Sequence, residues 1–422
     1  MLTYNTSFID NQAIIGILRR ACNHVDQRLM DHGVRVSYIV FRLLRDQPSL
    51  APTQLRDLCF TAALHDIGAY KTDEIDRMIQ FETENVWNHS IYGYLFVKYF
   101  SPLPERAPAV LFHHTSWQQL ERDDRLSQET KLSAQLLQIA DRLDIWLNTE
   151  RRPYAEFAQK LAAGRGSRFH PALVDRVLSE NFAPFTVEDI ENDLDFQHMQ
   201  NDIPFAPEAI HAYLCMIIYA IDFRSRHTVT HTMTTASISY ELAVLMGLDD
   251  DQRNEIICGA LLHDLGKIGI PVEILEFPGK LSPQAMSVMR THVDITEEIF
   301  AEAIPLSIQR IALRHHEKLD GSGYPRRLTA QDLTTSERIV SLADIVSALS
   351  GTRSYKEAFD KDRCITIISE QKEKGQLDPA LVETMITYYD AIMAETAERC
   401  QPILDIYQQL HAEYQQLYRY FA

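Results

Sequence analysis

The feature that most constrains this chain is a series of histidines and aspartates that occurs twice in the same order. In the N-terminal half the series is His32, His65-Asp66, His89, His113-His114 and Asp141. In the C-terminal half it is His231, His263-Asp264, His292, His315-His316 and Asp344. The first histidine precedes the His-Asp pair by 33 residues in one half and by 32 in the other. Matching order and spacing are typical of a duplicated domain.

These residue types indicate metal binding. A carboxylate beside an imidazole can bridge two divalent ions when other ligands converge on the pair. Each series supplies enough donors for two ions with open positions for water and substrate. A surface or capping role explains any one histidine as well, but it does not explain the repeated set. The six cysteines are scattered without a CxxC pair, which argues against structural zinc and disulfides.

The pattern of apolar residues predicts an all-α fold. Apolar positions recur at helical spacing through most of the chain, and few segments alternate as strands do. Gly247 is expected to end the helix that follows His231. Residues 151–204 are less regular, with several prolines and glycines, and we expect a linker carrying short helices there.

Composition limits the classes of partner. The net charge of −18 argues against extended surfaces for DNA, RNA or anionic membranes, because those need clustered positive charge. No apolar run is long enough to cross a membrane, so we expect a cytoplasmic protein. A small phosphorylated substrate held by metal ions remains compatible with this charge.

Four motifs identify a family resemblance. FRSRHTVTH, LLHDLGKIGIP, HHEKLDGSGYP and ADIVSALSGTRSY make residues 205–390 resemble an HD-GYP domain. This is the branch of the HD metal-dependent phosphohydrolase superfamily that cleaves bacterial cyclic dinucleotides, which are second messengers. Residues 1–150 resemble the broader HD superfamily and lack the Gly-Tyr-Pro loop. The resemblance implies tandem HD-type helical bundles, joined by the helical linker 151–204 and followed by a C-terminal helical extension, 391–422.

The resemblance also implies roles for individual residues. Asp264 is expected to bridge two divalent ions and to be essential for catalysis, and Lys267 to contact the scissile phosphate. The implied metal ligands are His231, His263, Asp264, His292, His315, His316 and Asp344. The implied substrate-binding residues are Lys267, Gly321, Gly323, Tyr324, Pro325 and Arg353. For Arg353 a phosphate or base contact and an exposed structural role are equally well supported.

The number and identity of the metal ions stay open. Some family members bind a third metal through a glutamate four residues before the first histidine ligand, and this chain has His227 there. His227 and His231 share a helix face at this spacing, so His227 is either a third-metal ligand or an unrelated polar residue. The final product, a linear dinucleotide or mononucleotides, depends on that choice. Histidine and carboxylate sets accept iron, manganese, nickel or zinc.

The N-terminal series forms a second candidate metal site. Its members are His32, His65, Asp66, His89, His113, His114 and Asp141. Ala69 stands where the other half has Lys267, and TSWQQLERDD replaces the Gly-Tyr-Pro loop. This half is therefore a second phosphohydrolase, a regulatory nucleotide-sensing module or a relic that serves only for packing.

Two classes of function compete. The favoured one is a cyclic-dinucleotide phosphodiesterase, with cyclic di-GMP as the first substrate candidate. The second substrate candidate is 3'3'-cyclic GMP-AMP, with nucleotidase activity in the N-terminal domain. The other class is a non-catalytic cyclic-dinucleotide receptor. Heptad-like apolar positions in the tail from Ile403 leave a homodimer open.

Overall fold

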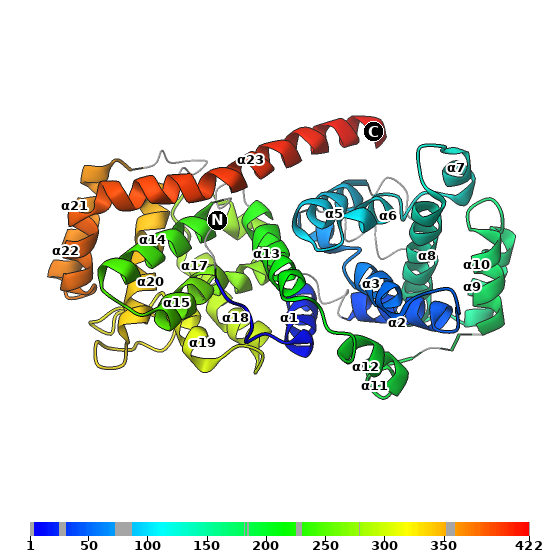
Figure 1. Cartoon of the computed structure of the whole chain (residues 1–422), viewed down its shortest axis with the longest axis horizontal. Coiled ribbons are helices and arrows are strands. Elements are labelled where there is room, and N and C mark those ends of the chain that lie inside the picture. The colour runs from blue at the N-terminus through cyan, green and yellow to red at the C-terminus, as the bar shows by residue number, and fades with distance from the viewer. Residues whose placement is uncertain are drawn as a thin grey trace. The chain divides into compact units, whose positions relative to one another are not determined.

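The computed structural model describes residues 4–24, 31–71, 87–180, 182–183, 185–224, 230–277, 279–351 and 359–421. Within these ranges the regular secondary structure is helical, and β-structure is limited to two isolated bridges. The prediction of an all-α fold is therefore confirmed (Figure 1). None of the helices in the described ranges is long and apolar enough to span a membrane.

The chain forms two compact units. The N-terminal unit consists of Cys22–Met216 and Leu410–Ala422, and the C-terminal unit consists of Met1–Ala21 and Ile217–Gln409. Residues 1–21 thus belong to the C-terminal unit, although the sequence analysis places them in the N-terminal domain. Residues 410–422, predicted as a C-terminal extension, belong to the N-terminal unit. Helix α1 (Asn11–Asn23) buries Ile14 and Ile17, and Arg20 donates from Nε to the carbonyl of Ile299 at 2.7 Å. An amphipathic helix needs an apolar partner, and residues up to Ala21 cluster with the C-terminal unit, where Arg20 also reaches the carbonyl of Phe300, 280 residues away in sequence.

The helices of the N-terminal unit include those that carry or precede the histidines and aspartates of the first series. In order they are α2 (His32–Leu44), α3 (Pro52–Ala63), η2 (Ile67–Lys71), α5 (Trp87–Phe100), η3 (Pro104–Arg106), α6 (Ala107–Leu111), α7 (Trp117–Arg122), α8 (Gln128–Asp144), η4 (Ile145–Thr149), α9 (Tyr154–Ala163), α10 (Pro171–Glu180), α11 (Val187–Glu191), α12 (Leu194–Asn201) and the first part of α13 (Pro207–Arg224). Helix α2 packs against α3 and α8, and α5 packs against α6.

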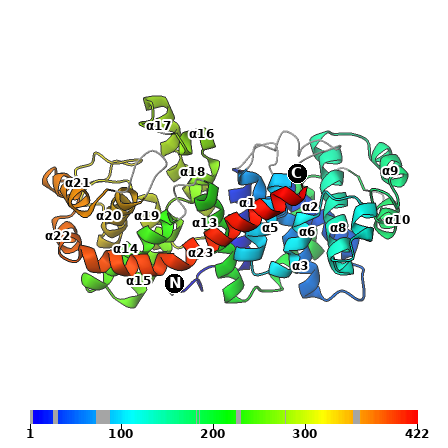
Figure 2. The ribbon, with the colours of Figure 1, turned by 90° about the horizontal axis from the view of Figure 1, so that it is seen from above.

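The segment predicted as a linker belongs to this unit. Helices α9 and α10 pack side by side, as Figure 2 shows. Phe157 and Phe196 from this segment are fully buried in the same apolar cluster as Val36 and Ile39 of α2. Burying a large apolar side chain stabilises a fold by about 1.5–3 kcal/mol, so these short helices extend the core of the unit.

The C-terminal unit repeats the arrangement. It contains the end of α13, then α14 (His231–Leu245), α15 (Asp250–Leu262), η5 (Leu265–Gly269), α16 (Val272–Leu275), α17 (Pro283–Arg290), α18 (His292–Phe300), α19 (Leu306–Leu313), α20 (Thr335–Ser350), α21 (Lys361–Glu373), α22 (Pro379–Thr387) and α23 (Tyr389–Phe421), of which residues up to Gln409 belong here. Helix α14 packs against α15 and α20, as α2 packs against α3 and α8 in the other unit.

Capping residues fix where the site-bearing helices begin. Thr334 caps α20, which carries Asp344, and its hydroxyl accepts a hydrogen bond from the backbone N–H of Glu337. Ser127 caps α8, which carries Asp141, in the same way through Thr130. Each cap stabilises its helix by about 1 kcal/mol. Gly247 lies just beyond the end of α14 with φ of 74°, as the sequence predicts.

Candidate metal centres

The seven candidate ligands of the C-terminal unit converge from five places in the fold. His231 is the first residue of α14, His263 and Asp264 follow α15, His292 is the first residue of α18, His315 and His316 follow α19, and Asp344 lies within α20. Most of these side chains therefore lie at helix ends, where a short turn directs them inward. Apart from His231 and His316, each of them is buried.

Asp264 lies between two groups of these side chains. Its Oδ2 atom is 3.4 Å from Nε2 of His231 and 3.1 Å from Nε2 of His263. Its Oδ1 atom is 3.6 Å from Nε2 of His292. Oδ1 of Asp344 is 3.2 Å from Nε2 of His231 and completes the first group. The two oxygens of Asp264 thus face different histidines, as a bridging ligand requires.

The second group consists of His292, His315 and His316, whose nearest nitrogens lie within 4.8 Å of one another. Nε2 of His292 is 3.4 Å from Nε2 of His315. Nδ1 of His316 is 3.7 Å from Oδ2 of Asp344, so Asp344 also extends towards both groups. The geometry offers two adjacent positions for cations, one for each group.

Backbone carbonyls orient the histidine rings. Nδ1–H of His263 donates to the carbonyl of Ala260 at 2.6 Å, and that of His315 donates to Ala312 at 2.6 Å. His292 donates to Met289 in the same way at 2.7 Å. A carbonyl only accepts hydrogen bonds, so the proton is on Nδ1 and the lone pair of Nε2 faces the centre. This is how metal-ligating histidines are usually held.

The residues present fit divalent metal ions. Two ligand atoms at about 2.1 Å from one ion lie about 3 Å apart when their bonds meet at a right angle. The separations around Asp264 are close to that value. Nε2 of His263 and Oδ1 of Asp264 are buried without a hydrogen-bond partner among the described residues. Buried polar atoms without partners are rare in folded proteins, and ligation to a cation would satisfy both.

A pocket of about 750 Å³ opens from this centre. His231, His292 and His316 line it, together with Lys267 and Tyr324. Lys267 Nζ forms an ion pair with Oδ2 of Asp264, which places a positive charge between the centre and the pocket. The volume lies in the range of about 300–1,000 Å³ that small-molecule sites occupy.

The Gly-Tyr-Pro loop is held against the second histidine group. The ring of Tyr324 lies over that of His316, with centroids 4.6 Å apart, and the backbone N–H of Tyr324 donates to the carbonyl of His316. Gly321 has φ of 76°, which favours glycine. A Cβ at Gly323 would lie 2.5 Å from Cα of Glu317, so only glycine fits there. Pro325 follows Tyr324 in this loop.

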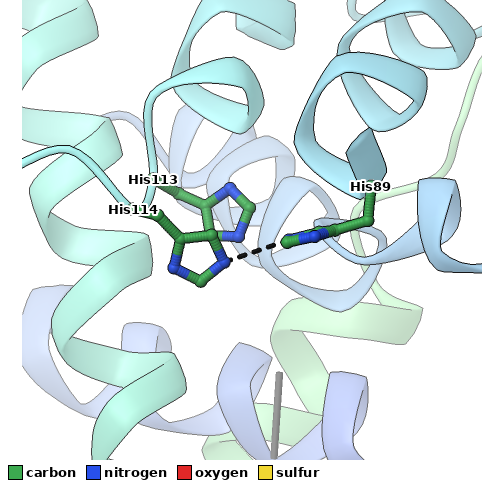
Figure 3. A group of neighbouring side chains, drawn as sticks. All are labelled: His89, His113 and His114. Atoms are coloured by element: carbon green, nitrogen blue, oxygen red, sulfur yellow. Dashed lines mark hydrogen bonds between the residues drawn. The ribbon is translucent and has the colours of Figure 1, made fainter. Parts of the chain in front are cut away.

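The N-terminal unit gathers a similar set. Figure 3 shows His89 of α5 beside His113 and His114, which follow α6, and Nε2 of His89 lies 3.0 Å from Nε2 of His114. Oδ1 of Asp66 is 3.4 Å from Nε2 of His65 and 3.8 Å from Nε2 of His113.

The other N-terminal side chains lie around the same centre. Nε2 of His32 is 3.4 Å from Oδ1 of Asp141 and 3.7 Å from Oδ2 of Asp66. Nε2 of His32, Nε2 of His65 and Oδ1 of Asp66 are buried without hydrogen-bond partners in the described ranges. By the same test as before, this second centre also fits a metal ion.

Comparisons with known proteins agree with this duplicated arrangement. Two family models described as HD domain match residues 29–146 and residues 216–381. The chain carries two HD domains. The predicted resemblance to the HD superfamily is therefore confirmed, and the N-terminal and C-terminal units contain one HD domain each.

Known relatives match these domains. The 3'3'-cGAMP-specific phosphodiesterase 1 of Vibrio cholerae is 26% identical over 90% of this chain and 93% of its own length. A cyclic di-GMP phosphodiesterase of Thermotoga maritima is 39% identical over 32% of this chain and 38% of its own length. A crystal structure of a cyclic GMP-AMP specific phosphodiesterase of V. cholerae, V-cGAP3, matches with a TM-score of 0.55 at 21% identity. That match covers 93% of this chain and 98% of the other, and it supports the fold.

The two HD domains differ around the last aspartate. In the N-terminal HD domain, Arg142 is buried and binds Oδ2 of Asp141 at 2.6 Å, and Asp144 accepts a hydrogen bond from Nδ1 of His32 at 2.7 Å. In the C-terminal HD domain the corresponding positions are Ile345 and Ser347, and the Ser347 hydroxyl is 2.9 Å from Nδ1 of His231. The N-terminal centre is thus surrounded by more charge.

Burial lowers the pKa of the histidines, and neighbouring carboxylates raise it. Burial lowers the pKa of His113 and of His315 to about 3, so both are neutral and available as ligands at pH 7. Burial also opposes protonation of His231, but Asp264 and Asp344 raise its pKa to about 9. In the N-terminal HD domain burial again opposes protonation, and Asp141 and Asp144 raise the pKa of His32 to about 10.

Two candidate residues lie outside the described ranges. They are His227, proposed for a third metal, and Arg353, proposed for a substrate contact. One further glycine in each HD domain has a role that motif reading did not assign. A Cβ at Gly266 would lie 1.9 Å from the carbonyl oxygen of His292, and one at Gly68 would lie 2.0 Å from that of His89. The glycine two residues after each His-Asp pair was a visible signal in both halves.

Proposed function

We propose that this protein is a metal-dependent phosphodiesterase that hydrolyses a bacterial cyclic dinucleotide in its C-terminal HD domain. The observation that carries this proposal is the position of Asp264 between two histidine groups, next to Lys267 and open to a pocket of about 750 Å³. Relatives that match this domain are named as phosphodiesterases of cyclic di-GMP and of 3'3'-cyclic GMP-AMP.

The chemistry follows from the charge of the substrate. A phosphodiester is an anion and repels nucleophiles, so its hydrolysis needs an activated water and cations beside the phosphoryl oxygens. Bound divalent ions supply both. His231, His263, Asp264 and Asp344 would hold one ion, and Asp264, His292, His315 and His316 the other.

The chain contributes a further cation and a fixed orientation. Lys267 is positioned to place its ammonium group near a non-bridging oxygen of the scissile phosphate, where negative charge increases in the transition state. The loop of Gly321, Gly323, Tyr324 and Pro325 would contact the substrate from the side of His316, since Tyr324 lines the pocket. Most of the candidate ligands are buried, and charges interact more strongly in such surroundings than in bulk water.

Cyclic di-GMP is the proposed substrate, and 3'3'-cyclic GMP-AMP is the second candidate because the relative that covers 90% of this chain carries that name. For the N-terminal HD domain we propose a metal-binding role through His32, His65, Asp66, His89, His113, His114 and Asp141. Its ligand set supports this proposal, while Ala69 in place of a lysine argues against the same phosphodiesterase activity there.

A direct assay tests the proposal. Purified protein is loaded with Fe(II) or Mn(II) without oxygen and incubated with each cyclic dinucleotide, and the products are separated by chromatography. We expect conversion to a linear dinucleotide or to mononucleotides, and loss of both turnover and C-terminal metal in Asp264→Ala. The matched control replaces His65 and Asp66 together by alanine and should retain C-terminal turnover. Tight binding without turnover under either metal would identify a receptor instead.

A further inference from the structure

One wall of the pocket beside the C-terminal metal centre comes from helix α23. Met393, Thr396, Ala397, Cys400, Leu404 and Tyr407 line the pocket. Met393, Thr396 or Ala397, Cys400, Leu404 and Tyr407 follow one another at three or four residues, which places them on one face of a helix. The HD-domain match ends at residue 381, so this wall lies outside the segment that the family model describes. The C-terminal helical extension, whose heptad-like positions leave a homodimer open, therefore also contributes to the candidate site.

The part of α23 that lines the pocket includes one small side chain, Ala397. Thr396 and Cys400 are buried, and their side chains bind Ser237 and Thr234 of α14. These contacts hold α23 against the C-terminal HD domain. Ala397, in contrast, is exposed on the side of the pocket, and its methyl group leaves open volume in front of it. A larger side chain at this one position would occupy the pocket without disturbing the contacts to α14.

The segment that follows α16 adds an exposed aromatic ring to the pocket lining, close to Lys280 in the sequence. Phe277 lines the pocket and keeps 46% of its surface exposed, although a phenylalanine of a folded domain is usually buried. Met286 and Met289 of α17 line the pocket as well. Flat aromatic rings and methionines are the side chains on which nucleobases stack or pack, whichever base is present.

We propose that α23 and Phe277 form the site that receives a nucleobase of the substrate, with Ala397 setting the room available to that base. This inference rests on the proposed phosphodiesterase activity and names its substrate-selecting surface. The pocket lining combines charged groups, among them Lys267 and the candidate metal ligands, with apolar side chains of α23 and Phe277. A cyclic dinucleotide likewise combines phosphates with bases, so a phosphate bound at the metals leaves a base to contact the apolar side chains of the same pocket.

Substitutions on α23 test the inference. Ala397→Leu should raise KM for the cyclic dinucleotide roughly tenfold or more while kcat changes little, because the leucine takes the volume of the base but touches no metal ligand. Ala397→Gly should keep the wild-type KM. The matched control is Ala394→Leu on the same helix, since Ala394 is exposed and is not among the pocket-lining residues. Thermal melting of each variant checks that α23 still packs.

Phe277 offers an independent variant. Phe277→Ala should raise KM roughly tenfold, and Phe277→Trp should restore it, because stacking depends on a flat ring. Tyr388→Ala is the control, since Tyr388 is 47% exposed but is not among the residues lining this pocket. Hydrolysis of bis(4-nitrophenyl) phosphate, which has no nucleobase, should be the same in Ala397→Leu as in the wild type.

The outcomes separate this inference from the proposed function. Wild-type turnover of a cyclic dinucleotide together with an unchanged KM in both Ala397→Leu and Phe277→Ala overturns the base site and leaves the phosphodiesterase proposal intact. Equal losses on the cyclic dinucleotide and on bis(4-nitrophenyl) phosphate also overturn it, because they indicate damage to the metal centre. Failure of the metal-loaded wild type to hydrolyse any cyclic dinucleotide overturns the proposed function and the base site with it.

Discussion

Replacing Gly266 by alanine should separate Asp264 from the second histidine group. The added Cβ would lie 1.9 Å from the carbonyl oxygen of His292 and 2.6 Å from the backbone nitrogen of Thr296. Both are backbone atoms of α18, so no side chain can rotate away. Cβ contacts below 3.0 Å essentially do not occur, so η5 and α18 must move apart by at least about 1 Å.

The size of the effect follows from that displacement. Oδ1 of Asp264 and Nε2 of His292 are 3.6 Å apart, and an added 1 Å leaves them too far apart to share an ion. A misplacement of about 1 Å costs roughly 100-fold in rate when a catalytic group depends on it. Overpacking of this kind costs about 1–3 kcal/mol of stability, so Gly266→Ala should still fold. We expect it to lose one ion per chain and at least about 99% of kcat/KM.

Metal content and steady-state kinetics on a cyclic dinucleotide are the measurements. Gly68→Ala serves as the matched variant, because its Cβ meets the His89 carbonyl at 2.0 Å in the N-terminal HD domain and should reduce only that domain's metal. Gly247→Ala controls for stability, since its φ of 74° is strained for alanine but no atom lies within 4 Å of its Cβ. Wild-type metal content together with wild-type turnover in Gly266→Ala would refute the reasoning.

Three further predictions follow from single contacts. Lys267→Met should lower kcat/KM roughly 100-fold while metal content stays at the wild-type level, because it removes a cation near the phosphate and no ligand; a change confined to KM would contradict this. The pKa of His231 is raised to about 9, so the metal-free imidazole is protonated at pH 7. Metal binding should therefore release a proton, and the affinity for metal should increase as the pH rises towards 9. The contribution of His231 to the stability of the metal-free protein is present below pH 6.5 and lost above about 9, and calorimetry in buffers of different ionisation enthalpy should detect the released proton. Glu413→Gln should lower the free energy of unfolding by about 1–2 kcal/mol in urea titrations, because Glu413 binds Lys98 at 2.6 Å and accepts from Tyr94 and Tyr99 at 2.8 Å.

The sequence predicted the all-α class, and it selected the histidines and aspartates that the structure brings together, because both depend on local pattern. A side chain at a helix end keeps its place in the series when the helices keep their order, so His231, His263 and His292 could be chosen without coordinates. The glycine at 266 could have been chosen on the same basis, since Gly68 repeats it. The reason why a glycine is needed at position 266 could not be predicted from the sequence. The close approach of Gly266 to His292 is a contact between two helical segments, and sequence spacing does not report such contacts.

The sequence did not predict which elements pack against one another. The apolar face of α1 predicts that the helix is buried, but Ile14 and Ile17 fit any apolar surface, and nothing local selects the C-terminal unit. The same holds for α23, whose period indicates a helix with one packed face. That this face borders the pocket depends on Thr396 meeting Ser237, a contact across 159 residues. Both cases show local pattern specifying an element but not its neighbours.

The charges around the last aspartate argue that the two HD domains are not interchangeable. Arg142 takes Oδ2 of Asp141, which leaves that carboxylate with one oxygen, Oδ1, directed at His32. In the C-terminal domain Asp344 directs Oδ1 at His231 and Oδ2 at His316, so it extends towards both histidine groups. Each domain therefore pairs a cation with one of its candidate ligands, but Arg142 is buried, whereas Lys267 pairs with Asp264 from the lining of the pocket, where it can also reach a substrate. Both domains keep the same series of histidines and aspartates, and the pocket-lining position of Lys267 supports our proposal that the C-terminal centre is the one that hydrolyses a phosphodiester.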